Sequence, residues 1–353
     1  LVEVAGSPDT WGPWPSDLVR WLTDLAIAGP AICALRAIRR QRSRFDTDLT
    51  AHALRASTAS IAWAFTSFFN ATEAQAIVES SVPVRFDHWK KLLVHCAEGG
   101  LGSVLDEWFH LIPDQCRLNK ASDTPLKDMA ALASEVLRLN DGRSFSDFYD
   151  RIRRTGEARS HALRSHFAMR YGQARGATAE GENPVAVRNA FNSPFRPFVL
   201  VSTSVGQEGL DFHYYAHAIV HWNLPGNPVD LEQREGRVHR YKNHAVRKNV
   251  AARFAHDPAI LTSTDPWEGL FALATDKKSS DGGLRPHWIY DGEAQIKRLV
   301  PMLPFSREVG KLQQLVEATS LYRMTIGQPR QAELMEVLAG LSKEEQDTLR
   351  TAV

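Results

Sequence analysis

The sequence has few cysteines and no histidine pattern typical of a metal site. Its three cysteines are widely spaced and form no CxxC pair, which favours reduced thiols in an intracellular protein over a disulfide framework or a zinc site. His213, His217 and His221 recur at every fourth position. They span a predicted loop and strand, however, so no shared helical metal face is expected. The sequence therefore predicts no metal ligands.

Long apolar runs are also missing from the first part of the chain. The longest uncharged stretch within the first 50 residues, 25–35, is too short to cross a bilayer and is broken by Gly29-Pro30. We therefore predict no signal peptide, no membrane span and a cytoplasmic, nucleoid-associated location. The chain begins with Leu1 instead of methionine, which is typical of a piece of a longer protein.

The chain has no excess charge of either sign. Its 42 basic and 41 acidic residues leave a net charge of +1, so any nucleic-acid surface must be local. Residues 233–248 hold six basic side chains against one acidic one. Three of them, Lys242, Arg247 and Lys248, are candidates for contacts with a phosphate backbone. An ordinary solvated surface is an equally good interpretation of these three.

The most informative stretch, residues 198–248, begins with a short valine-rich run. Residues 198–201 are continuously apolar, as expected for a strand covered on both faces of a parallel sheet. The run ends in hydroxyl side chains and is followed by Gly206, Gly209 and Asp211. Ligands of open α/β sheets bind beyond the carboxyl ends of the strands. Phosphate or ribose contacts are therefore expected here.

A second strand, residues 218–222, is followed by a predicted helix. Asn227 is a good N-cap and Pro228 a good first helical residue. On an ideal helix Gln233, Arg237 and Arg240 lie within roughly 60° of one another. Leu231 and Val238 fall on nearly the opposite side. The helix is thus predicted to bury its leucine and valine and to present a Gln/Arg/Arg face.

The remaining residues predict a mostly helical chain around this stretch. Residues 1–155 favour helices over 17–28, 30–44, 49–70, 72–79, 86–97, 103–111 and 125–139. Period-two alternation over 160–171 favours a strand, and a helix over 184–191 leads into the strand at 198. The tail suggests a strand over 287–290 and helices over 293–300, 307–321 and 331–349. Trp63, Phe65 and their aromatic neighbours are predicted to form core and not a base-stacking surface.

Two segments in the central stretch resemble a known family. Residues 202–211, STSVGQEGLD, resemble the fifth conserved motif of superfamily-2 helicases, and residues 233–240, QREGRVHR, match the sixth, QRxGRxxR, at every fixed position. The segment between them is similar to Swi/Snf-type translocases, closest to the bacterial RNA-polymerase-associated branch. The resemblance covers roughly residues 156–255. It is specific because both motifs occur in order and in the expected strand and helix contexts.

The resemblance implies an α/β fold with three regions. Residues 156–255 would form a RecA-like, parallel-sheet C-terminal motor domain. Residues 1–155 would be a helical insertion or accessory region, and residues 256–353 a mostly helical brace. The family's fourth motif is not recognisable. Asp106 and Glu107 superficially resemble its acidic ATPase motif, but their neighbours have helical apolar spacing, which favours packing.

The resemblance also implies roles for individual residues. Arg237 and Arg240 would reach across a cleft to ATP on a first motor domain and stabilise the transferring phosphoryl group. Gln233 would orient them or contact phosphate. Four residues would lie on the nucleotide side: Gly206, Glu208, Gly209 and Asp211. Thr203 and Ser204 would lie near the nucleic-acid backbone.

The sequence contains no GxxxxGK[ST] motif, so the loop that holds the β and γ phosphates is missing from it. The chain alone is therefore expected to hydrolyse little ATP, and Mg²⁺ would be bound mainly by the first motor domain. We favour the C-terminal half of an ATP-dependent translocase or helicase acting on nucleic acid, with duplex DNA as the expected track. The alternatives are a non-hydrolysing module that binds nucleic acid or protein, and a subunit that completes an ATPase on another chain.

Overall fold

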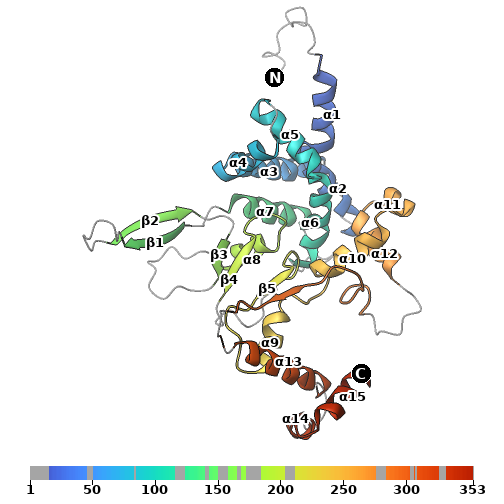
Figure 1. Cartoon of the computed structure of the whole chain (residues 1–353). Coiled ribbons are helices and arrows are strands. Elements are labelled where there is room, and N and C mark those ends of the chain that lie inside the picture. Colours follow the sequence, from blue (N-terminus) through green and yellow to red (C-terminus); the bar gives the residue numbers. More distant parts are fainter. Residues whose placement is uncertain are drawn as a thin grey trace, which may run out of the picture. The chain divides into compact units, whose positions relative to one another are not determined.

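The computed structural model describes most of the chain (Figure 1), which divides into two compact units. The described residues are 16–45, 51–82, 85–115, 124–139, 143–149, 158–164, 168–171, 184–202, 211–275, 284–302, 306, 308–325 and 331–352. Unit 1 comprises Leu1–His166, Ser193–Arg196 and Asp257–Gly269, and unit 2 comprises Phe167–Asn192, Pro197–His256 and Leu270–Val353. The three regions predicted from the sequence remain a prediction.

Unit 1 is mainly helical, with helix positions close to those predicted. Its helices are α1 (Leu18–Ala28), α2 (Pro30–Arg40), η2 (Gln41–Arg44), α3 (Ala51–Phe69), α4 (Thr72–Ser81), α5 (His88–Glu98), α6 (Leu101–Gln115), α7 (Pro125–Arg138) and α11 (Pro258–Thr262). Strands β1 (Arg143–Tyr149) and β2 (Ala158–Arg164) form an antiparallel pair. The predicted strand over 160–171 is therefore wrong in extent, because its first part belongs to β2 and only its last part to another strand.

The break between α1 and α2 follows from Gly29 and Pro30. The Gly29 N–H donates to the Leu25 carbonyl at 2.9 Å, and a Cβ at Gly29 would lie 2.5 Å from that carbonyl oxygen. Pro30 then starts α2 at a position where its missing N–H costs nothing.

By length and composition alone, Leu18–Arg40 is apolar enough to span a membrane, a test that core helices of soluble proteins also pass.

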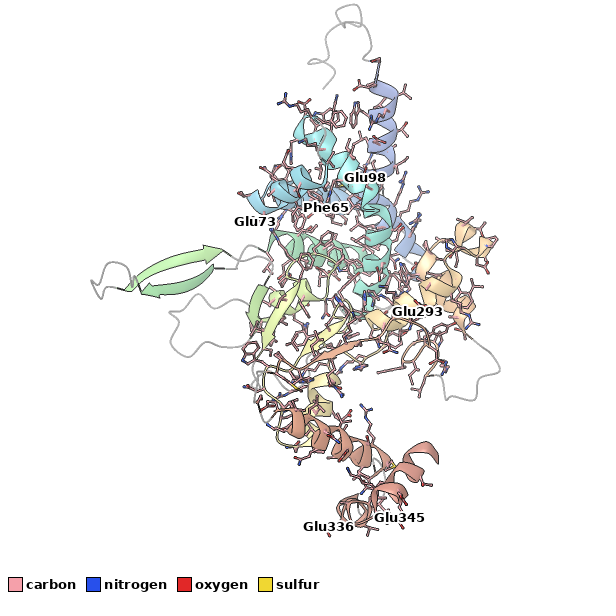
Figure 2. All side chains as sticks on the ribbon, viewed as in Figure 1. Phe65, Glu73, Glu98, Glu293, Glu336 and Glu345 are labelled. Atoms are coloured by element: carbon pink, nitrogen blue, oxygen red, sulfur yellow. The ribbon has the colours of Figure 1, made fainter. Side chains whose placement is uncertain are left out.

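The core of unit 1 is aromatic. Phe65 of α3 and Trp108 of α6 both contact Phe195, with ring centroids 5.6 and 5.4 Å apart, and Figure 2 shows Phe65 enclosed by neighbouring side chains. Asp106 pairs with Arg40, which confirms that the acidic pair on α6 belongs to a packed helix. Trp63 is 67% exposed, so its predicted place in the core is wrong.

A buried polar cluster attaches residues 257–269 to the rest of unit 1. Asp265 Oδ2 accepts from His110 Nδ1 at 2.8 Å and from Gln41 Nε2 at 3.1 Å. Its other oxygen accepts from the Trp267 backbone N–H at 3.0 Å, at the start of α12 (Pro266–Ala274). One carboxylate thus caps a helix and joins three segments that are distant in sequence.

Unit 2 contains two pairs of parallel strands. Strand β3 (Ala168–Tyr171), helix α8 (Pro184–Phe191) and strand β4 (Val199–Ser202) form the predicted strand–helix–strand unit, with Ala168 opposite Val199. Strand β5 (Ala218–Val220) pairs with β6 (Lys297–Leu299). Val199 and Val201 are exposed, so the prediction that β4 is covered on both faces is wrong.

The tail of unit 2 departs from the predicted elements. The remaining helices of this unit are α9 (Pro228–Glu235), α10 (His244–Phe254), α13 (Glu308–Thr325), α14 (Gln331–Ala339) and α15 (Lys343–Ala352). Residues 287–290 form turn and irregular structure instead of a strand, and β6 lies where a helix was predicted.

The single helix predicted over 331–349 is two helices (Figure 2). Ser342 and Glu345 form a capping box at the break, with reciprocal bonds of 2.9 and 3.4 Å.

Two aromatic residues on α3 provide a test of the unit 1 core. Phe65 is 1% exposed, so Phe65→Ala should lower the free energy of unfolding by about 3–5 kcal/mol. Trp63→Ala, two positions earlier on the same helix, is the matched control and should change it by no more than about 0.5 kcal/mol. Denaturant unfolding measures both changes. Equal losses in the two variants would contradict the packing described here.

Candidate functional site

The sixth-motif segment begins with a capped helix. The Asn227 side-chain oxygen accepts from the Asp230 backbone N–H at 2.8 Å, and Pro228 is the first helical residue. Both positions agree with the sequence prediction. Helix α9 ends at Glu235, however, and Gly236 follows as its C-cap. A Cβ at Gly236 would lie 2.9 Å from the Glu232 carbonyl oxygen, which favours glycine at this end.

The predicted Gln/Arg/Arg face on one helix is therefore wrong. Gln233 lies on α9, whereas Arg237 lies in the turn after it and Arg240 in the following irregular segment. A tight turn ends the helix. In this turn the N–H groups of Val238 and His239 both donate to the Glu235 carbonyl, at 2.9 and 3.1 Å. The predicted burial of the apolar side is confirmed, since Leu231 and Val238 are both buried.

This turn brings the end of the fifth motif to the sixth. The Phe212 backbone N–H donates to the Arg237 carbonyl at 3.1 Å, and Arg240 Nη1 lies 2.7 Å from Asp211 Oδ1 in a half-buried ion pair. Arg240 Nε also donates to the Gly236 carbonyl at 2.9 Å. Asp211, Arg237 and Arg240 are thus gathered in one place. The other predicted residues of the fifth motif lie outside the described residues: Thr203, Ser204, Gly206, Glu208 and Gly209.

Arg237 is a buried cation with unused hydrogen-bond donors. It is 8% exposed, and its Nε and Nη2 have no partner within the described part of the chain. Burial lowers the pKa of its guanidinium, and the charges of Arg234 and Arg240 lower it further. A buried cation without an acceptor is costly. The free-energy cost of removing the Arg237 guanidinium from water is already present in the folded chain. An anion that binds here would therefore offset this cost.

Two of the three predicted phosphate-backbone residues are buried. Lys242 is 5% and Arg247 1% exposed. Arg247 donates to the carbonyls of Lys242 and Tyr214 at 2.7 and 2.6 Å, and the Lys242 ammonium lies 5.3 Å from the Phe271 ring centroid. Both side chains hold unit 2 together and are not available to a nucleic-acid backbone in this structure. Lys248, exposed on α10, remains a candidate.

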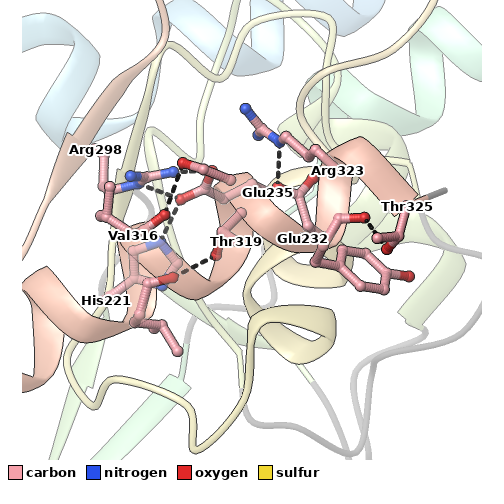
Figure 3. A network of polar contacts seen from close by, with 11 residues as sticks. His221, Glu232, Glu235, Arg298, Val316, Thr319, Arg323 and Thr325 are labelled. Atoms are coloured by element: carbon pink, nitrogen blue, oxygen red, sulfur yellow. Dashed lines mark hydrogen bonds and ion pairs between the residues drawn. The ribbon is translucent and has the colours of Figure 1, made fainter. Parts of the chain in front are cut away.

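A buried ion-pair network at the end of α9 was not predicted from the sequence. Glu235 Oε1 lies 3.0 Å from His221 Nε2, and Arg298 Nε and Nη2 donate to the two carboxylate oxygens at 2.5 and 2.6 Å (Figure 3). Burial raises the pKa of the Glu235 carboxyl, but the hydrogen bonds from His221 and Arg298 outweigh it and lower this pKa to about 2. Glu235 is therefore ionised at neutral pH.

One comparison with known proteins matches part of the chain to a family model. Residues 129–242, about a third of the chain, are similar to the helicase conserved C-terminal domain. Comparisons with curated proteins and with solved structures gave no significant match.

A helicase C-terminal domain implies a RecA-like fold, with which the parallel β3–β4 pair and its α8 connection are consistent. The match ends at Lys242 and so includes both recognised motifs. The match relates this part of the chain to helicases.

The depressed pKa of Glu235 predicts a stability contribution that depends on pH. Its folded-state pKa, about 2, lies below the ordinary glutamate value of 4.5, so the contribution is fully present above about pH 5 and disappears as pH falls toward 2. Glu235→Gln should therefore be less stable than the natural chain at pH 7, with a difference that shrinks steadily below pH 5. Denaturant unfolding at several pH values measures this difference. A difference that does not change with pH would contradict the assigned pKa.

Proposed function

We propose that the chain is the second motor half of an ATP-dependent translocase or helicase, with duplex DNA as its track and closest kinship to Swi/Snf-type translocases. ATP and its Mg²⁺ would be held mainly by a first motor domain, in the same chain or another. The observation that supports this most is Arg237, a buried arginine with unpartnered donors at the fixed position of the sixth motif.

The chemistry proposed for Arg237 is charge stabilisation. Charge on a phosphoryl group in transfer spreads over its oxygens, and a positioned guanidinium stabilises it without reorganising at the moment of reaction. Arg237 suits this role because its backbone is fixed by Phe212 and its Nε and Nη2 have no acceptor among the described residues. Gln233 is exposed one turn before it and would contact phosphate or orient the arginine.

Arg240 would have a different role, because Asp211 already balances its charge. We propose that this pair couples the nucleotide site to the fifth motif, whose hydroxyl residues Thr203 and Ser204 would lie near the nucleic acid. The described residues contain no cluster of three His, Cys, Asp or Glu side chains able to hold a metal.

A second candidate is a helicase-derived module that binds nucleic acid or protein without turnover. It is favoured by the neutralisation of Arg240 within the chain and by the lack of a GxxxxGK[ST] motif in the sequence. The two proposals differ in one measurable property, which is ATP turnover by the complete motor in the presence of duplex DNA.

Arg237→Ala tests the main proposal. In the complete motor, this change should lower the turnover number for ATP by about 10³-fold or more, as for arginine fingers of related enzymes. Arg237→Lys should restore little, because an ammonium does not reproduce the planar guanidinium fork. Steady-state ATPase assays with saturating duplex DNA measure both variants.

The matched control is Arg253→Ala, which removes an exposed arginine of α10. It should leave turnover within about twofold of the natural protein, because surface substitutions away from a site have small effects. Undiminished turnover in Arg237→Ala would reject the finger assignment. A complete motor that binds DNA but never hydrolyses ATP would favour the second candidate.

Lys248→Ala tests the proposed track contact. If Lys248 neutralises one phosphate, its removal should weaken binding equally for different duplex sequences and reduce the salt slope by about 1. Arg253→Ala serves again as the control for loss of one surface charge from α10. Salt titrations of duplex binding, followed by fluorescence anisotropy, give the slopes. Identical slopes for Lys248→Ala and the natural chain would exclude Lys248 from the interface.

A further inference from the structure

The end of α9 is held by a residue from the far end of unit 2 in sequence. Arg298 of β6 makes two hydrogen bonds to the buried Glu235 carboxylate, at 2.5 and 2.6 Å, and His221, the residue directly after β5, lies 3.0 Å from the same group. The three side chains converge in Figure 3. A bidentate pair of this kind fixes orientation as well as distance.

The backbone of Glu235 in turn fixes the segment that carries Arg237. Its carbonyl accepts from the N–H groups of Val238 and His239 at 2.9 and 3.1 Å. Arg237 lies between Glu235 and these two residues. Any displacement of Glu235 would therefore shift the turn and the guanidinium that the turn presents.

The body of α9 is held separately by α13. Leu231 packs against Leu224 and Leu315, and Arg323 Nε donates to Glu232 at 2.7 Å near the surface. These contacts keep α9 folded against unit 2 without involving Arg298. The Glu235–Arg298 pair thus controls the end of the helix next to Arg237, whereas α13 supports the rest of it.

The Glu235–Arg298 ion pair is attached to the two-stranded sheet of β5 and β6. The His221 N–H donates to the Leu299 carbonyl at 2.8 Å, so the residue after β5 that contacts Glu235 also bonds the backbone beside Arg298. Ion pairs in protein interiors add little net stability compared with apolar packing of the same volume. They can fix one arrangement among several, and here the arrangement includes a motif arginine.

We propose that Arg298 is a positioning residue for the sixth motif, which acts through Glu235 to hold Arg237 in its working geometry. This inference rests on the proposed function of Arg237. It makes β6, a tail strand outside both recognised motifs, a functional part of the motor. The tail is then more than a brace.

The test compares Arg298→Met, Arg298→Lys and Arg323→Met in the complete motor with saturating duplex DNA. Misplacement of a reacting group by about 1 Å can cost about 10²-fold in rate, so Arg298→Met should lower the turnover number about 10- to 100-fold, with a much smaller change in KM for ATP. Arg298→Lys keeps the charge and should recover part of the loss. Arg323→Met, which removes a 59%-exposed partner of the same helix, should stay within about twofold.

Circular dichroism and thermal unfolding of each variant separate positioning from folding. A turnover number that falls only in proportion to the folded fraction would overturn the inference. If Arg298→Met does not fold, Glu235→Gln takes its place, since it removes the charge that Arg298 holds while keeping a side chain of similar shape. A folded Glu235→Gln with natural turnover would also overturn the inference.

The Arg237→Ala variant distinguishes failure of this inference from failure of the proposed function. If Arg237→Ala loses turnover while Arg298→Met and Glu235→Gln keep it, the positioning role is wrong and the proposed function stands. If Arg237→Ala also keeps its turnover, the proposed function itself fails.

Discussion

The ion pair between Glu235 and Arg298 is the contact on which the geometry of the sixth motif depends. A carboxylate taken out of water must be matched by charge and by hydrogen bonds, and Glu235 finds both in Arg298 and His221. Arg298 lies on β6 and His221 directly follows its parallel partner β5, so the end of α9 is fixed relative to this strand pair. From that fixed end the Glu235 carbonyl sets the turn, and the turn sets Arg237. The chain of contacts runs without interruption from a tail strand to a motif arginine.

Much of the helical structure could be predicted from local signals. Apolar spacing together with Gly29-Pro30 and Pro125 placed the helices of unit 1 within a few residues, because these signals act over one or two turns. Asn227 and Pro228 located the start of α9 for the same reason. The end of α9 was missed. Gly236 lies inside a motif whose spacing fits a continuous helix, and the turn is fixed by bonds to Phe212 and Asp211, which are distant in sequence.

The candidate site was predictable in its residue types but not in their environments. The motif arginines and Asp211 follow from the resemblance, whereas the burial of Lys242 and Arg247 depends on carbonyls and rings supplied by tertiary structure. Strand β6 shows the same limit. Its residues have a composition compatible with a helix, and only pairing with β5 makes them a strand. Arg298 had no local signal because its partner lies 63 positions away.

The two motif arginines differ in a way that bears on how the site would respond to an anion. Arg237 is buried, and its described surroundings give Nε and Nη2 no acceptor, so a phosphate there would add contacts without breaking any. Arg240 already faces Asp211 at 2.7 Å, so a phosphate would have to replace or share that carboxylate. An anion would thus bind Arg237 without competition, whereas at Arg240 it would compete with Asp211. Because Asp211 ends the fifth motif, this competition offers a physical route by which nucleotide occupancy could alter the segment proposed to lie along the nucleic acid.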